Sequence, residues 1–158
     1  MSQYCVDVRT FDTLVTERIA EAAQYARLMA GSASNVGKQQ QGIGDTHLTY
    51  LDTFIQDYVL LKVLLLWPFI MPIVEENTYL KQKNMDTVSD WAFFIDPIDG
   101  TKAYIQGEND YAILAGLIHE GNVVAAVHCH PGMSDKGEII HAVKGCGVWR
   151  RKILTGVD

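Results

Sequence analysis

Cysteine is scarce in this sequence. Cys5, Cys129 and Cys146 are the three present, and none of them belongs to a CxxC pair. An odd number of widely spaced cysteines argues against a disulfide framework, and the lack of paired cysteines argues against a structural zinc site. The pattern therefore predicts reduced thiols and a cytoplasmic protein.

Basic residues are also in deficit. Thirteen lysines and arginines stand against nineteen aspartates and glutamates, a formal net charge of −6. Such a chain has no overall positive field to hold a nucleic acid polymer. An acidic protein that handles an anionic substrate needs a local source of positive charge, which a bound metal ion commonly supplies.

Long hydrophobic runs are missing as well. The most apolar stretch, Val59–Val74, is interrupted by Lys62, Pro68 and Pro72. It is shorter than the roughly 20 apolar residues that a membrane span needs. Met1–Asp12 contains no apolar segment of the kind found in secretory signals. We therefore expect neither a membrane partner nor secretion.

Two helices are predicted in the first part of the chain. The first covers residues 12–30 and ends at Gly31, and Gly31–Gly44 is expected to form a loop or a weak hairpin. The second covers Tyr50–Leu66, with Thr49 as its N-cap and Pro68 as its terminator. The apolar stripe of the first helix consists of Leu14, Val15, Ile19, Ala22, Ala23 and Ala26.

Short apolar runs predict strands in the remainder. Glu120-Gly121-Asn122 has the composition of a hairpin turn between two of them. Two helices followed by hairpin-connected strands indicate an α+β layered domain, with the helices packed on a mostly antiparallel sheet and a single domain over residues 1–158. The predicted strands are Met71–Val74, Trp91–Ile95, Tyr111–His119, Val123–His130, Glu138–Val143 and Gly147–Arg151.

The most informative segment begins in the second predicted strand. Asp96 and Asp99 follow its buried apolar run, and Pro97 between them is expected to end the strand and bend the chain. Two carboxylates held close together repel each other unless a cation lies between them, and hard oxygen ligands suit Mg²⁺. Gly100 and Thr101, if they open a short helix at Lys102–Gln106, direct backbone amides at an anion.

Glu75-Glu76 ends the preceding predicted strand in the same way. If the two strands are neighbours, Glu75 lies at the same sheet edge as Asp96 and Asp99. A carboxylate cage beside an anion-binding turn is typical of metal-assisted hydrolysis of phosphate esters.

These residues resemble a known family. Asp96-Pro97-Ile98-Asp99-Gly100-Thr101 is similar to the DP(I/L)DGT motif of the inositol monophosphatase superfamily, which consists of Mg²⁺-dependent, lithium-sensitive phosphatases. Weaker matches occur in the family's order along nearly the whole chain. They are Leu48–Asp52 to "VTxxD", Ile73–Glu76 to "(I/F)GEE", the strand ending at Pro131 to "GVVxxP", and Gly145–Trp149 to "GxGA".

The resemblance implies the N-terminal half of an αβαβα fold and hydrolysis of a small phosphorylated metabolite. It implies that Glu75, Asp96, Asp99 and the carbonyl of Ile98 bind Mg²⁺, about two or three ions, with Mn²⁺ as a substitute.

The resemblance also implies roles beside the metal. Asp52 and Thr101 would orient and deprotonate the attacking water, and Gly100 and Thr101 would bind the phosphate through their amides. Lys102 is closer to the bisphosphate nucleotidase branch, which acts on 3′-phosphoadenosine 5′-phosphate, than to the inositol phosphate branch.

The sequence departs from the family at two points. Val74 stands where the family usually has glycine. The family's chains are considerably longer, and their later half supplies a further aspartate ligand in a "WDxAxG" motif that is absent here; Asp158 does not correspond to it. We therefore expect weak or no activity from this polypeptide alone unless a second chain, as in a homodimer, completes the site.

Other hypotheses remain open. Asp52 would also be explained as an acid in the first helical turn, where it favours the helix dipole. The chain could be an inactive fragment or a dimerising module that exposes Leu64–Trp67, or a haloacid-dehalogenase-type phosphatase with Asp96 as nucleophile. His128 and His130 share a strand face but lack a third ligand, so packed histidines are favoured over a metal site. Trp67, Phe69 and Ile70 are expected in the core or at an interface.

Overall fold

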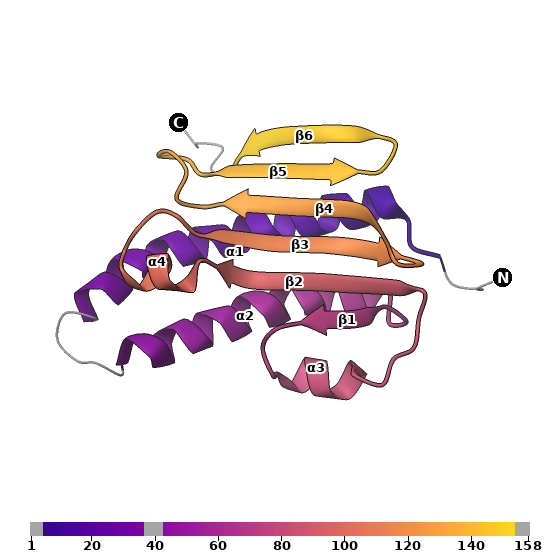
Figure 1. The fold of residues 1–158 in the computed structure, drawn as a ribbon, viewed down its shortest axis with the longest axis horizontal. Coiled ribbons are helices and arrows are strands. Elements are labelled where there is room, and N and C mark those ends of the chain that lie inside the picture. Colours follow the sequence, from indigo (N-terminus) through magenta and orange to yellow (C-terminus); the bar gives the residue numbers. More distant parts are fainter. Residues whose placement is uncertain (1–4, 37–42, 154–158) are drawn as a thin grey trace.

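The computed structural model describes residues 5–36 and 43–153. Two long helices come first along the chain, and four consecutive strands come last (Figure 1). The helices are α1 (Val8–Val36), α2 (Ile43–Leu66), α3 (Tyr79–Asn84) and α4 (Thr101–Ile105). The strands are β1 (Met71–Val74), β2 (Trp91–Asp99), β3 (Ala112–His119), β4 (Asn122–His130), β5 (Glu138–Val143) and β6 (Gly147–Lys152).

The six strands form one sheet in chain order, from β1 to β6. β1 and β2 are parallel, and every other neighbouring pair is antiparallel. The long helices α1 and α2 lie side by side across one face, α1 over β4 and β5 and α2 over β2 (Figure 1). In the described part of the chain, the opposite face carries no helix. The predicted α+β arrangement with a mostly antiparallel sheet is confirmed.

Both predicted bounds of the first helix are wrong: α1 begins at Val8 and not at residue 12, and it does not end at Gly31. α1 continues through Gly31 to Val36. A glycine inside a helix costs only about 1 kcal/mol relative to alanine, which is small beside the packing of the stripe before it. Leu14 of that stripe is partly buried against the core. The other members are fully buried: Val15, Ile19, Ala22, Ala23 and Ala26.

The predicted start of the second helix is also wrong, whereas its end is confirmed. α2 begins at Ile43, so Thr49 lies within the helix and does not cap it. Threonine and aspartate are tolerated inside helices at a cost of less than ~1 kcal/mol each, so a capping pattern alone does not fix a helix start. The loop expected between Gly31 and Gly44 is helical at both ends; its residues 37–42 lie outside the described residues. α2 ends at Leu66, before Pro68.

The strands match the sequence more closely. β1 and β5 have the predicted bounds, and β3, β4 and β6 each differ by one residue at one end. Glu120 and Gly121 have φ values of 49° and 74°. Both lie in the left-handed region, as a two-residue type I′ hairpin turn requires. The hairpin between β3 and β4 is confirmed.

The core lies between the two long helices and the sheet. Phe11 of α1 is in ring contact with Trp67 and with Phe93 of β2, and both centroid distances are 5.8 Å. Ile70 is fully buried and Phe69 packs against the core, so these residues belong to the core as expected. The dimerising-module hypothesis predicted an exposed Leu64–Trp67, but only Leu65 and Leu66 are exposed, whereas Leu64 and Trp67 are buried.

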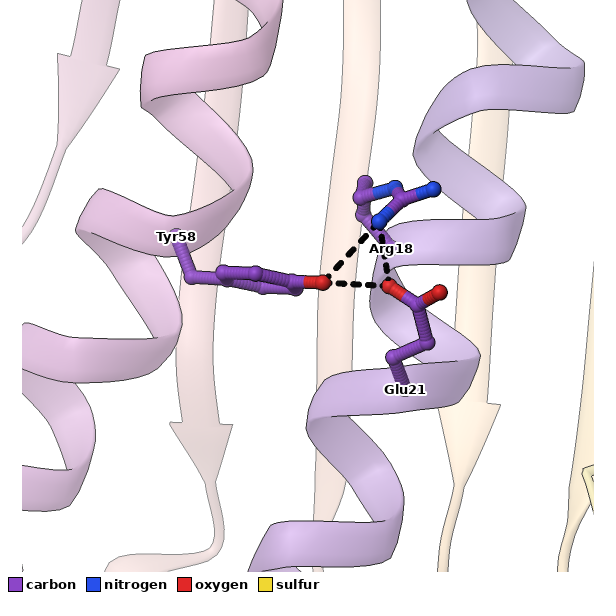
Figure 2. A network of polar contacts seen from close by, with 3 residues as sticks. All are labelled: Arg18, Glu21 and Tyr58. Carbon is purple, nitrogen blue, oxygen red and sulfur yellow. Dashed lines mark hydrogen bonds and ion pairs between the residues drawn. The ribbon is translucent and has the colours of Figure 1, made fainter.

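A polar cluster joins the two long helices on their outer side (Figure 2). Arg18 of α1 donates from Nη1 to the Tyr58 hydroxyl of α2 at 3.0 Å and forms an ion pair with Glu21 at 2.6 Å. The Tyr58 hydroxyl donates in turn to Glu21. The three side chains therefore fix the relative position of α1 and α2, and with it the position of the residues that α2 presents to the sheet.

The described residues include no helix that is both long and apolar enough to cross a membrane. Cys5 and Cys146 are exposed, Cys129 is buried, and all three are free thiols.

Candidate metal and phosphate site

The parallel pairing of β1 and β2 brings Glu75 and Asp96 together. The strands are in register from Met71↔Ala92 to Val74↔Ile95. Both strands run in the same direction, so the next residues in the chain, Glu75 and Asp96, lie side by side at one sheet edge. The condition on which the shared sheet edge depended, that these two strands are neighbours, is met.

The structure corrects the expectation that Pro97 ends the second strand. β2 continues through Pro97 to Asp99. Its pairing with β3 is irregular there, because Asp96 faces Leu114 whereas Asp99 faces Ala112. Three steps along β2 thus correspond to two along β3, which is a bulge, and a bulge accommodates a proline that has no N–H to donate. The bend between the two aspartates exists, but inside a strand.

The turn after β2 requires a glycine. Gly100 has φ +87°, and a Cβ at this position would lie 2.8 Å from the carbonyl oxygen of Asp110. Thr101 then begins α4, one residue earlier than predicted, and its Oγ1 donates to the carbonyl of Ile98 at 3.0 Å. The carbonyl keeps a second lone pair. Lys102 is exposed in the first turn of α4.

α4 is fixed to the helical layer by a buried tyrosine. The Tyr104 hydroxyl donates to the carbonyl of Ala26 in α1 at 2.9 Å, and its ring packs edge-on against Tyr111 at a centroid distance of 4.8 Å. The turn that carries Gly100 and Thr101 is therefore held at both ends, by β2 and by Tyr104.

Asp52 faces the acidic edge from the helical layer. Its residue is only 7% exposed, and its pKa rises to about 7, first because of burial and then because of the negative charges of Glu76, Glu75 and Asp96. Since α2 begins at Ile43, Asp52 does not lie in the first turn, and the helix-dipole explanation for it is wrong. No hydrogen bond joins Asp52 to Thr101 among the described residues, because the Thr101 hydroxyl donates to Ile98.

Asp96 has the surroundings expected of a carboxylate without a counter-ion. Burial raises its pKa, and so do the charges of Glu75 and Asp99, whereas a hydrogen bond from the backbone N–H of Ile98 lowers it. Its Oδ1 is buried without a hydrogen-bond partner. An orphaned carboxylate oxygen among other carboxylates is a donor set that suits a hard divalent cation.

The side chains are nevertheless not gathered as closely as in a loaded metal centre. Among the described residues, no three His, Cys, Asp or Glu side chains form a group able to hold an ion. What the structure does show is that Asp52, Glu75 and Asp96 influence one another's charges and lie near one sheet edge. Their carboxylate oxygens are ligands that suit a divalent cation.

Sequence reasoning missed Gln56. This α2 residue is fully buried, and its side-chain amide contacts the backbone of Glu76 twice. Its Oε1 accepts from the Glu76 N–H at 2.7 Å, and its Nε2 donates to the Glu76 carbonyl at 3.0 Å. The available signal was a polar residue four positions after Asp52, which places both on one face of the helix.

The two histidines of β4 lie away from these acids in the sheet. The His128 and His130 rings are 6.3 Å apart, and His130 Nε2 lies 3.6 Å from an exposed oxygen of Asp110. They share a strand face, as the spacing predicts.

The chain was compared with known proteins. Residues 7–155 match the profile of the inositol monophosphatase family. The 3′(2′),5′-bisphosphate nucleotidase CysQ of Aggregatibacter actinomycetemcomitans is 26% identical over 136 residues, which are 86% of this chain and 48% of that protein. The enzyme of the same name from Haemophilus influenzae is 26% identical over 90 residues, 57% of this chain and 33% of that protein.

The fold has counterparts among solved structures. The inositol monophosphatase from Anabaena (Nostoc) sp. PCC 7120 superposes with a TM-score of 0.67 at 20% identity, covering 91% of this chain and 46% of that one. The chain thus spans about half the length, or less, of the relatives that it matches. With a family profile matched over almost its whole length and the corresponding fold, this chain belongs to the inositol monophosphatase family.

Proposed function

We propose that this chain provides the metal-binding half of a Mg²⁺-dependent phosphatase that hydrolyses a small phosphomonoester. The observation that supports this most strongly is the meeting of Glu75 and Asp96 on adjacent parallel strands, opposite a buried Asp52 whose pKa they raise. Carboxylates gathered at one edge repel each other, and a bound divalent cation relieves that repulsion.

The proposed roles follow the positions of the residues. Glu75, Asp96, Asp99 and the carbonyl of Ile98 hold the metal. When bound, Mg²⁺ supplies positive charge that polarises the phosphoryl group and lowers the pKa of water. Asp52, a buried carboxylate that faces this edge, is the proposed acceptor of the proton from the attacking water.

The turn at the start of α4 is the proposed phosphate contact. Gly100 has no side chain, so it can adopt the left-handed conformation and leave room for the Asp110 carbonyl. The amides of Gly100 and Thr101 and the ammonium of Lys102 are donors for phosphate oxygens. Thr101, whose hydroxyl is anchored on Ile98, would assist Asp52 in orienting the attacking water.

The proposed substrates are inositol phosphates or bisphosphorylated nucleotides such as 3′-phosphoadenosine 5′-phosphate. The relatives named 3′(2′),5′-bisphosphate nucleotidase support the second class. The family match favours this proposal over a haloacid-dehalogenase-type mechanism. A covalent phosphate trapped on Asp96 would support that mechanism instead.

The activity of the whole enzyme is proposed to need more than these residues, because the chain spans about half of its relatives. Lithium inhibition is expected from the family resemblance. An inactive, metal-indifferent dimer in gel filtration with a parallel phosphate-release assay would support an interaction module instead.

Asp99→Asn tests the metal site directly. Isothermal titration should show Mg²⁺ or Mn²⁺ binding to the parent and an affinity at least ~10-fold weaker in the variant, because an amide has no charge to offset the cation. Asp86→Asn is the matched control, since Asp86 is an exposed acid before β2. Equal affinity in Asp99→Asn and in the parent would remove Asp99 from the site.

A further inference from the structure

The buried side-chain amide of Gln56 replaces a missing strand neighbour. β1 ends at Val74, so the N–H and C=O of Glu76 lie beyond its pairing with β2. Gln56 satisfies both groups, at 2.7 Å and 3.0 Å, as a peptide group of an adjacent strand would. The side chain is 0% exposed, so water does not compete for these two bonds.

This contact acts on the backbone of the acidic edge. The Glu76 N–H belongs to the peptide plane that joins Glu76 to Glu75, so fixing this N–H also fixes the orientation of the plane from which Glu75 projects. An apolar side chain at position 56 could fill the same volume but could not set that orientation. A second contact from α2 supports the segment, because the Thr78 hydroxyl donates to Asp57 at 2.7 Å.

The same helix face carries Asp52. Residues 52 and 56 are one helical turn apart, and both face the end of β1. Asp52 is close enough to Glu75 and Glu76 for their charges to act on it. Gln56 therefore connects the helix that carries Asp52 to the segment that carries the acids of the sheet.

We propose that Gln56 is a positioning residue for the metal site: by holding both backbone groups of Glu76, it directs Glu75 toward the cation shared with Asp96. The inference rests on the proposed function of that edge. Gln56 contacts no ligand itself and acts through Glu75. Residues that orient metal ligands in this way typically contribute 10–100-fold to metal affinity.

The test uses two variants that remove the amide and keep the volume, Gln56→Leu and Gln56→Met. The full chain is titrated with Mn²⁺, and free Mn²⁺ is measured by electron paramagnetic resonance. Both variants should bind Mn²⁺ about 10–100-fold more weakly than the parent. Met is unbranched and flexible, so Gln56→Met keeps the test usable if Gln56→Leu does not fold.

Val63→Ala is the matched control, because Val63 is a fully buried α2 residue and its truncation destabilises the core. It should leave Mn²⁺ affinity within about 2-fold of the parent. Amide hydrogen exchange supplies a second readout: the Glu76 amide should lose protection in both Gln56 variants and keep it in Val63→Ala.

Three results would overturn the inference. Folded Gln56 variants with parental Mn²⁺ affinity would show that the amide does not position Glu75. An equal loss of affinity in Val63→Ala would show that general stability is responsible. A parent that binds no Mn²⁺ while its Glu76 amide stays protected would refute the proposed function itself, and the metal role of Gln56 with it.

Discussion

At the scale of single residues, Asp52 shows how the fold makes an ordinary carboxyl unusual. Its pKa rises from 3.8 to about 7 because of burial and three neighbouring acids. Between these two values, the folded chain retains a proton that the unfolded chain has lost. The free energy of unfolding therefore falls as pH increases from about 4 to about 7.

We expect Asp52→Asn to stabilise the metal-free protein at pH 8 and to have little effect at pH 4. Asparagine never carries the buried charge, and each unit of pKa shift corresponds to about 1.4 kcal/mol, so the gain at pH 8 should be roughly 2 kcal/mol or more. Urea unfolding in EDTA at both pH values measures it. The control Asp86→Asn should not raise the free energy of unfolding at either pH. An equal gain in Asp52→Asn at pH 4 and pH 8 would show that Asp52 does not titrate in this range.

At the scale of elements, most strand bounds were predictable, whereas the end of α1 and the start of α2 were not. Each strand is a short apolar run with a turn signal at its end, such as Glu120-Gly121. The helix boundaries depend on packing far from the boundary residues, so Gly31 and Thr49 were misleading. The error mattered for the site, because a helix starting at Tyr50 would have placed Asp52 in a first turn.

The candidate site was predictable in part for the same reason. The acids at residues 75, 96 and 99 come directly after apolar runs that the sequence marks, although Asp96 and Asp99 themselves belong to β2. The parallel pairing of β1 and β2 places 75 beside 96. Gln56 could not be inferred, because its partners are backbone atoms of Glu76 that a sequence does not display. The bulge at Pro97 depends on the register of β3, which the sequence does not display either.

The contact between α1 and α2 gives a prediction at this scale. Tyr58→Phe removes the hydroxyl that links Arg18 to Glu21 (Figure 2), leaving only the ion pair within α1. We expect the free energy of unfolding to fall by about 1–2 kcal/mol, since the lost hydrogen bonds involve charged groups. Tyr79→Phe is the control, because Tyr79 is 70% exposed and should change stability by less than ~0.5 kcal/mol. Equal effects of the two substitutions in urea unfolding would contradict a role for the cluster.

At the scale of the whole molecule, the helices of residues 5–36 and 43–153 leave one sheet face open (Figure 1). A row of apolar or small residues crosses this face from β1 to β6, and each member pairs with the next. The ring of Phe94 lies over Gly116, where a Cβ would come within 2.3 Å of it. The row consists of Ile73, Phe94, Gly116, Ala126, Ala142 and Val148.

We expect the chain to self-associate through this row, because a continuous apolar strip across a sheet favours contact with a second surface. Val148 is 70% exposed at the β6 edge, so Val148→Lys should place a charge in the contact and weaken association at least ~10-fold in sedimentation velocity. Leu28→Lys is the matched control, because Leu28 is 74% exposed on α1, in the helical layer behind the sheet. A parent that stays monomeric at high concentration would contradict the prediction. So would a Leu28→Lys variant that dissociates as readily as Val148→Lys, since the contact would then involve the helices and not the open sheet.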